Sequence, residues 1–192
     1  MELFAREKSE VTKDTPLALR ISPKRLSEFV GQEHILAKGK LLRRAIEADR
    51  IVSLIFYGPP GCGKSALARI IAEGTKAYFE EVNAVTSGVA DLREIIERAW
   101  QRRKLSGQKT ILLIDELHHF NRSQQDALLP DVEKGIVIMI GITTENPYFY
   151  INSRLLSRSQ IFEFKPLSDE DLKVILKRAI EDKERTVWAK RE

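Results

Sequence analysis

One stretch of eight residues, positions 58–65, constrains the fold of this chain more than any other. Its sequence, Gly-Pro-Pro-Gly-Cys-Gly-Lys-Ser, fits the pattern G-x-x-x-x-G-K-[ST] of a phosphate-binding loop. The glycines let the backbone curl so that several N–H groups converge on phosphate oxygens. Lys64 can then reach the β- and γ-phosphates of a nucleotide, and the Ser65 hydroxyl can ligate Mg²⁺. The residues expected to contact the nucleotide here are Gly58, Pro59, Pro60, Gly61, Cys62, Gly63, Lys64, Ser65 and Ala66.

The residues on either side of the loop agree with this interpretation. Residues 53–57 form a short apolar run of the kind found in a buried strand. After the loop, Leu67, Ile70 and Ile71 recur at helical spacing, and Gly74 is a typical helix end. The alternative is a surface turn rich in Gly and Pro. Strand, loop and helix in this order are, however, the arrangement that a phosphate-binding loop requires.

Composition indicates a globular protein without a membrane segment. The 192 residues are 43% hydrophobic and 31% charged, which excludes a disordered chain, and they are numerous enough for one domain with a sizeable core. No apolar run approaches the roughly 20 residues of a membrane span, so we expect no membrane partner. With Cys62 as the single cysteine, no internal disulfide can form, and a cytoplasmic location is expected. The net charge of +4 permits contact with nucleic acid without establishing it.

Further apolar runs predict an α/β domain. Four more strands are predicted at residues 78–82, 110–114, 136–140 and 161–164. Amphipathic patterns predict helices at residues 35–50, at 91–104 and from Ser168 onwards. Because the strand runs are nearly continuous in Val, Ile and Leu, they indicate a parallel sheet covered by helices on both faces, which makes three layers. The basic end of the second helix is interpreted as a solvated helix terminus, with nucleic-acid contact as the alternative; it comprises Arg98, Arg102, Arg103 and Lys104.

Two adjacent carboxylates follow the most hydrophobic of these strands. Asp115 suits the second Mg²⁺ ligand that a phosphate-binding loop needs, and Glu116 can polarise a water aligned with the γ-phosphate. The alternative is a charged turn between a strand and a helix. The neighbouring pair His118-His119 has no Cys or His partner at a useful spacing, so zinc is not expected.

Several motifs taken together make the chain resemble a known family. Pro59-Pro60, Asp115-Glu116, Thr143-Thr144 and the segment 155–158 together look like an AAA+ ATPase of the clamp-loader branch. Four segments, at residues 29–34, 83–88, 124–130 and 143–147, resemble the bacterial replication-associated recombination protein A family, whose eukaryotic relative is the Werner helicase-interacting protein. The resemblance covers about residues 16–182, nearly the whole chain.

The resemblance implies roles for residues outside the loop. Thr144 is similar to a sensor on the strand beside Asp115, and Asn83 to the residue that restrains the catalytic glutamate. Arg158 resembles an arginine finger that acts on the ATP of the next subunit, which implies self-association; a helix cap is its alternative role. Val30 and Gly31 correspond to the loop near adenine. Cys62 departs from the usual threonine, but its side chain is not expected to contact phosphate.

The resemblance also implies an organisation and an activity for the chain. An N-terminal arm (1–15), an ATPase domain (16–166) and the start of a truncated helical lid (167–192) are expected, with the sensor-2 arginine and the oligomerisation region outside this chain. The last predicted helix has apolar residues without an obvious partner, so we expect an N-terminal part of a longer protein.

The implied function is ATP hydrolysis, with ATP/ADP and Mg²⁺ bound, in replication-fork maintenance, recombination and repair. The implied partners are single-stranded or forked DNA, further copies of the chain and replication proteins such as single-strand-binding protein, in a nucleoid-associated setting. The alternatives are a clamp-loader or branch-migration subunit, and a nucleotide-gated interaction module with little turnover.

Overall fold

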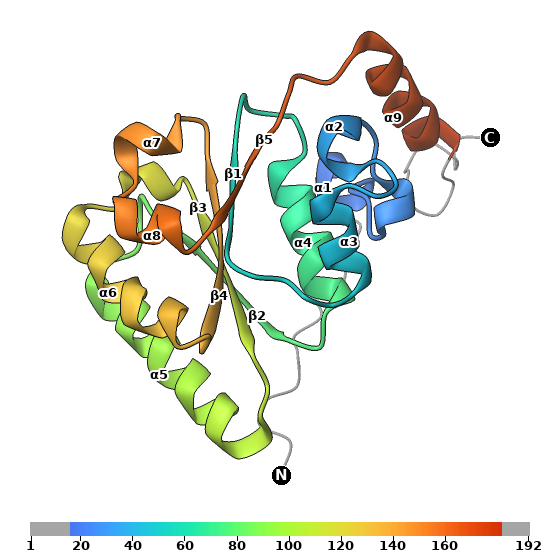
Figure 1. The fold of residues 1–192 in the computed structure, drawn as a ribbon. Coiled ribbons are helices and arrows are strands. Elements are labelled where there is room, and N and C mark those ends of the chain that lie inside the picture. The colour runs from blue at the N-terminus through green and yellow to red at the C-terminus, as the bar shows by residue number, and fades with distance from the viewer. Residues whose placement is uncertain (1–15, 182–192) are drawn as a thin grey trace.

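Five parallel strands form the centre of the molecule, with helices packed on both faces (Figure 1). The structure is a computed structural model that describes residues 16–181. The strands are β1 (Leu54–Tyr57), β2 (Tyr78–Asn83), β3 (Thr110–Asp115), β4 (Val137–Thr143) and β5 (Gln160–Glu163). They are ordered β2-β3-β4-β1-β5, and each neighbouring pair is parallel. The predicted three-layer α/β class is therefore confirmed.

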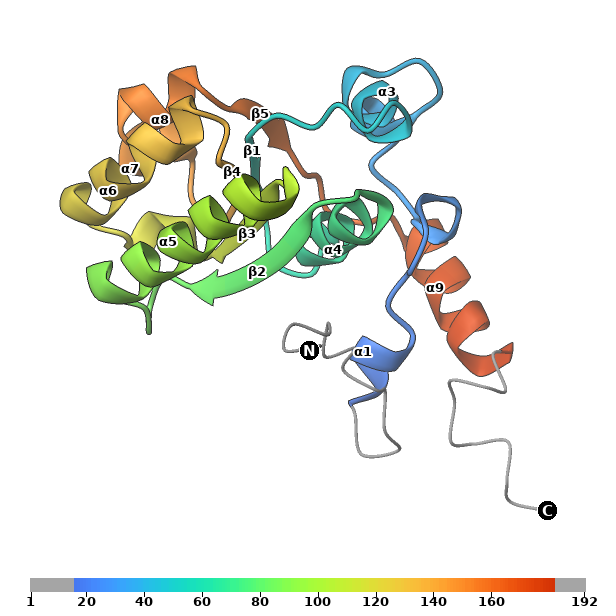
Figure 2. The same ribbon diagram turned by 90° about the horizontal axis from the view of Figure 1, so that it is seen from below.

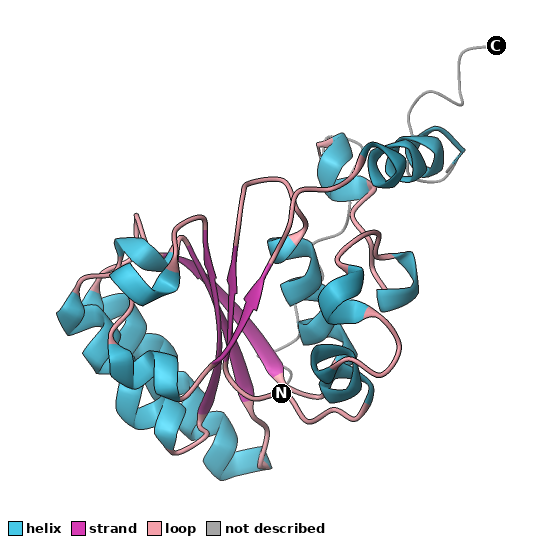
Figure 3. Ribbon diagram, turned by 45° about the horizontal axis from the view of Figure 1, so that its top comes forward, coloured by secondary structure: helices cyan, strands magenta, loops and turns pink. Residues whose placement is uncertain are grey.

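The helices fall into two layers, which Figure 3 separates clearly. One face of the sheet is covered by α5 (Val89–Ser106), α6 (Arg122–Glu133) and α8 (Ser153–Ser157), with α7 (Pro147–Tyr150) beside them. The other face is covered by α2 (Glu33–Leu36), α3 (Leu41–Glu47) and α4 (Lys64–Gly74). The remaining elements are α1 (Leu17–Arg20), the 3-10 turns η1 (Leu26–Glu28) and η2 (Leu117–His119), and α9 (Asp169–Glu181), which lies beyond α4 near α1 (Figure 2).

The strand sequences alternate between two hydrophobic cores. Leu112 and Ile114 of β3 face the α5–α6 layer, where they meet residues such as Leu92. Ile111 and Leu113 of the same strand face the α4 layer. Since successive side chains of a strand point to opposite faces, both sets must be apolar, which explains the continuous run.

Several predicted boundaries were wrong. The helix predicted at residues 35–50 is two short helices, α2 and α3, separated by a turn at Gly39 with φ of 87°. The strand predicted at 136–140 continues to Thr143 as β4. Helix α6 was not predicted, because Pro130 lies inside it and several of its buried residues are polar.

The basic end of α5 has internal partners. Arg98 and Arg102 both form ion pairs with Glu80 of β2, and Arg102 also lies over the ring of Tyr78. The hydrogen bond to Glu80 raises the pKa of Arg98 above its ordinary value, against an opposing effect of burial. The prediction of a merely solvated helix end was therefore wrong for these two arginines, which tie α5 to the edge of the sheet.

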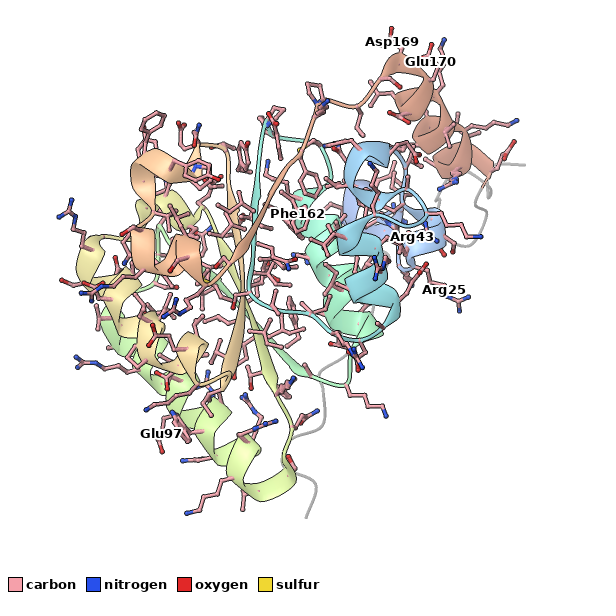
Figure 4. The ribbon with its side chains drawn as sticks, in the orientation of Figure 1. Arg25, Arg43, Glu97, Phe162, Asp169 and Glu170 are labelled. Atoms are coloured by element: carbon pink, nitrogen blue, oxygen red, sulfur yellow. The ribbon has the colours of Figure 1, made fainter. Side chains whose placement is uncertain are left out.

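The final described helix, α9, begins as predicted. Asp171 N–H donates to Ser168 Oγ at 3.1 Å, and Ser168 N–H donates to the Asp171 carboxylate at 3.1 Å, so the two residues form a capping box at the predicted start. Asp169 and Glu170 project outward from the same end (Figure 4). Leu172, Leu176 and Ile180 are exposed along the helix. The predicted arm at residues 1–15 and the end at 182–192 lie outside the described residues.

Candidate nucleotide-binding and hydrolysis site

The phosphate-binding loop connects β1 to α4, as the sequence predicts. Gly58 follows β1 directly, and an added Cβ there would lie 2.2 Å from the carbonyl oxygen of Phe164, so no larger residue fits. Phe164 N–H in turn donates to Tyr57 O at 2.7 Å, which holds the end of β1 against the chain that leaves β5. Burial, with a smaller contribution from the negative charge of Glu163, raises the pKa of Tyr57 above 10.0, so its hydroxyl stays protonated at neutral pH.

Lys64 is held inside the curve of the loop. The residue is 6% exposed, and Nζ donates to the carbonyl oxygens of Gly58 and Pro59, both at 2.7 Å. The thiol of Cys62 donates to the same Pro59 oxygen at 2.9 Å and is buried in the core beneath the loop. This places the Cys62 side chain in the protein interior, consistent with the expectation that it does not contact phosphate.

A cavity of about 600 Å³ opens beside the loop. This volume lies within the usual range for a small-molecule site. Its wall includes Phe29, Val30, Gly61, Cys62, Gly63, Ala66, Ile175 and Arg178. Val30 thus lines the cavity, whereas Gly31 is not part of the wall: an added Cβ at Gly31 would lie 2.7 Å from Leu167 Cδ2, in the segment that leads to α9.

Gln32, which the sequence analysis did not select, connects the loop to this segment. Gln32 is buried, and its amide donates to the carbonyl oxygens of Cys62 at 3.3 Å and Lys165 at 2.7 Å. Its Oε1 accepts the N–H of Lys165 at 2.9 Å. A buried amide whose groups are all paired fixes two backbone segments relative to each other. A glutamine after Gly31 gave no local signal for these contacts, since Lys165 is far away in sequence.

The two predicted carboxylates lie at the end of β3. Asp115 is the register partner of Asn83, so the ends of β2 and β3 meet at one edge of the sheet. By strand alternation Asp115 shares the face of Ile111 and Leu113, which is the α4 side. Ser65 lies in the first turn of α4. A hydroxyl and a carboxylate are ligands that Mg²⁺ accepts, so these two residues fit a magnesium site completed by phosphate and water.

Glu116 has an unusual backbone and an unpaired oxygen. Its φ of 53° is in the left-handed region, which costs roughly 1–3 kcal/mol for a non-glycine residue and is typical of functional sites. Its Oε2 is buried and has no hydrogen-bond partner among the described residues. His118 Nδ1 lies 3.4 Å from this oxygen. The Glu116 side chain as a whole is 35% exposed, so the carboxylate is also accessible from solvent, as a water-activating group requires.

The end of β4 carries two threonines with different surroundings. Thr143 is buried, and its Oγ1 lies 2.9 Å from His118 Nδ1. Thr144 is exposed and follows the strand end, so its predicted place on the strand was wrong by one residue. Asn83 is also exposed, and its Oδ1 accepts the N–H of Val85 at 2.9 Å. No local signal in the sequence indicated the contacts of His118 with Thr143 and Glu116, and the sequence suggested for His118 only a zinc site that was not expected.

The turn that carries His118 is fixed by packing against β4. Leu117 is fully buried, and an added Cβ at Gly141 would lie 2.4 Å from Leu117 Cδ2. We therefore expect Gly141→Ala to push η2 away from the sheet and to lower the free energy of unfolding by about 1–3 kcal/mol. Urea denaturation measures this change. Gly74→Ala is the matched control, because no atom lies within 4 Å of its added Cβ. Equal stability of the two variants would contradict this packing.

Arg158 lies away from the loop of its own chain. It caps the C-terminus of α8, on the face of the sheet opposite α4 (Figure 1). Its side chain is 52% exposed and forms an ion pair with Glu133 at 3.2 Å. An exposed arginine at this position is available to a neighbouring molecule.

Comparison with known proteins gives the family. Residues 54–167, more than half of the chain, match the model of the ATPase family associated with various cellular activities (AAA). The chain belongs to the AAA family. The matched residues begin with β1 and extend past β5, so they contain the loop, both carboxylates and Arg158.

Named relatives of this AAA chain include proteins of replication and recombination. It is 53% identical over 170 residues to replication-associated recombination protein A of Escherichia coli K12, which is 88% of this chain and 38% of that protein. It is 44% identical over 166 residues to ATPase WRNIP1 of Dictyostelium discoideum, which is 86% of this chain and 19% of that protein. The predicted resemblance is confirmed, and the chain spans about two fifths of the length of the bacterial relative.

The AAA fold is also found in a solved motor protein. The Thermotoga maritima RuvB Holliday junction branch migration motor superposes with a TM-score of 0.67 at 29% identity, covering 83% of this chain and 53% of that one. In the described part of the AAA chain no helix combines the length and the apolar character that a membrane span requires. Within the same residues no group of three or more His, Cys, Asp or Glu side chains is placed to bind a metal ion by itself.

Proposed function

We propose that this chain is the ATPase domain of a protein that hydrolyses ATP, with Mg²⁺, to act on DNA in replication-fork maintenance, recombination and repair. The observation that carries the proposal is the arrangement at the carboxyl edge of the sheet. There the phosphate-binding loop borders a nucleotide-sized cavity, and Glu116 presents a buried carboxylate oxygen without a hydrogen bond. In this proposal residues 16–166 form the catalytic domain, and α9 begins a helical lid over the cavity.

Each residue of the site has a distinct role in this proposal. The loop N–H groups and Lys64 bind the phosphates, with Lys64 exchanging the carbonyls of Gly58 and Pro59 for phosphate oxygens. Ser65 and Asp115 hold Mg²⁺, which when bound neutralises charge on the β- and γ-phosphate oxygens. Val30 and the cavity wall surround the base and ribose.

The remaining groups act on the reacting atoms. Glu116 orients and polarises the attacking water, and Thr144 detects the γ-phosphate. Asn83 restrains Glu116 until a ligand arrives. Arg158 from the next copy stabilises charge that develops in the transition state, so the site works within an assembly.

DNA as the substrate is supported by the relatives. Identity of 53% to a protein named for replication-associated recombination exceeds the 29% identity to the branch migration motor, which favours the first role over the second. The presence of both Glu116 and Arg158 argues against a nucleotide-gated module with little turnover. Replication proteins such as single-strand-binding protein are further proposed partners, in the cytoplasm at the nucleoid.

ATP hydrolysis by the full-length protein tests this proposal. We expect hydrolysis that depends on Mg²⁺ and that rises when single-stranded or forked DNA is added, because a DNA-acting motor couples turnover to its substrate. The measurement is phosphate release with no DNA, with duplex, with single strands and with forks of matched length. Hydrolysis that is absent, or unchanged by all three DNAs, would contradict the proposal.

A further inference from the structure

Three side chains form a continuous contact between the end of β4 and the catalytic carboxylate. Thr143 Oγ1 lies 2.9 Å from His118 Nδ1, and the same nitrogen lies 3.4 Å from Glu116 Oε2. Thr143 directly precedes Thr144, the proposed γ-phosphate sensor. The contact therefore connects Thr143, which is next to the proposed sensor, with Glu116, the residue proposed to activate water.

The imidazole of His118 is held in place on several sides. Its side chain is 13% exposed. The ring lies against His119, with centroids 4.2 Å apart, and edge-on to Tyr150 at 6.0 Å. The preceding residue, Leu117, is packed into the space above Gly141. A ring fixed in this way can orient a neighbouring group.

The hydrogen-bonding capacity of the three groups allows Nδ1 one strong partner at a time. A neutral imidazole nitrogen either carries one proton or offers one lone pair. Thr143 Oγ1 already accepts the N–H of Glu145 at 3.0 Å. With His118 Nδ1 placed at hydrogen-bond distance from Thr143, Glu116 Oε2 is the atom left without a hydrogen bond. A small shift of Thr143 or of the ring would transfer Nδ1 from the threonine to the carboxylate.

The Asn83 side chain does not hydrogen-bond to Glu116 Oε2 in this structure. Its Oδ1 accepts the N–H of Val85, which closes a turn at the end of β2. Among the described residues, the ionisable side chain that reaches Glu116 Oε2 is therefore His118, on the turn that follows β3.

We propose that His118 is a positioning residue that links Thr143 to Glu116 and orients the Glu116 carboxylate for water activation. The proposal rests on the function proposed above and names a further residue for that same site. It implies that a shift at the end of β4, beside Thr144, changes the orientation of the Glu116 carboxylate through the His118 ring.

The test compares variants of the full-length protein by kcat and by nucleotide affinity. A misplacement of about 1 Å can cost roughly 10²-fold in rate, so we expect His118→Ala to lower kcat roughly 10- to 100-fold. The dissociation constant for a fluorescent ATP analogue should change by less than about twofold, because His118 is not part of the cavity wall. His118→Asn should recover much of kcat, since its amide N–H lies near the position of Nδ1. Arg122→Ala, at an exposed position four residues further along at the start of α6, is the control and should retain activity.

A double-mutant cycle tests the link to Thr143. Thr143→Val removes the hydroxyl and keeps the shape, whereas Thr143→Ser keeps the hydroxyl. We expect Thr143→Val to lower kcat and Thr143→Ser to retain most of it. If the two residues act as a unit, His118→Ala combined with Thr143→Val should be little slower than His118→Ala alone.

The outcomes separate this proposal from the proposed function. If the wild type fails to hydrolyse ATP, the proposed function fails. If the wild type hydrolyses ATP but His118→Ala is as fast, the positioning role is wrong while the function stands. Loss of nucleotide binding in His118→Ala, or His118→Asn as slow as His118→Ala, would make His118 a structural residue and overturn the proposal. Full additivity in the cycle would remove the link to Thr143.

Discussion

Replacing Glu116 by Gln is expected to lower the ATP hydrolysis rate by roughly 10²–10⁴-fold while nucleotide affinity stays nearly unchanged. Gln keeps the shape of the side chain but is not a base, so the attacking water loses its polarising group. Because Glu116 is proposed to act only as the barrier is crossed, its loss should lower kcat and leave binding intact. Phosphate release and titration with a fluorescent ATP analogue measure the two quantities separately.

Lys64→Ala provides the contrast for this prediction. Lys64 is proposed to contact phosphate in the ground state, so its removal should abolish nucleotide binding as well as turnover. Its loss also leaves the carbonyls of Gly58 and Pro59 without their present donor, which is a local effect within the loop. If Glu116→Gln hydrolysed ATP near the wild-type rate, or lost binding as Lys64→Ala does, the catalytic assignment of Glu116 would be wrong.

Arg158→Ala should leave nucleotide affinity almost unchanged and lower turnover in the assembled protein by up to roughly 10³–10⁵-fold. A guanidinium from the neighbouring copy neutralises charge that develops on the γ-phosphate in the transition state. Within one chain Arg158 pairs with Glu133 at 3.2 Å, and both side chains are about half exposed. Such exposed pairs contribute about 0–1 kcal/mol, so the arginine is released to a neighbour at little cost.

A second arginine on the same helix serves as the control. Arg154 of α8 is also exposed, and Arg154→Ala should retain most of the turnover because it is not the proposed finger. The stability of both variants should match the wild type in thermal unfolding. An equal loss of turnover in Arg154→Ala and Arg158→Ala would assign the effect to the charge of the helix and not to a finger.

The sheet and its loop were predictable because their signals are local. Strands buried on both faces must be continuously apolar, and β3 and β4 show this in their sequences. The loop needs glycines, a lysine and a hydroxyl in a fixed order, so its place between β1 and α4 followed from one short motif. Asp115 and Glu116 followed in turn from the strand that they end.

Helix α6 was missed because tertiary contacts determine it. Gln124 and Gln125 are polar yet buried, which hides the apolar face that would reveal a helix. Gln125 is satisfied by Phe120 O, Tyr150 O and the N–H of Asn152, none of which a local pattern contains. The helix start was nonetheless encoded, since Asn121 and Gln124 form a capping box.

The supporting residues of the site were missed for the same reason. Gln32 hydrogen-bonds to the backbone of Lys165, and His118 lies at hydrogen-bond distance from Thr143. The two residues of each pair are distant in sequence. No motif of residue types at fixed spacing marks such contacts. The family resemblance led to Asn83 as the residue that restrains Glu116, and it gave no indication of His118, whose Nδ1 lies 3.4 Å from Glu116 Oε2.

The most direct test of a hydrolysis site shared between copies is a mixing experiment. Full-length Arg158→Ala and full-length Glu116→Gln, each nearly inactive alone, are combined over a range of ratios, and phosphate release is measured. Some interfaces in a mixed assembly pair an intact Glu116 with an intact Arg158 of the next copy, so we predict that part of the activity returns, with a maximum at intermediate ratios. If no activity returns although mixed assembly is demonstrated independently, Arg158 does not act on a neighbouring site and the shared-site account is wrong.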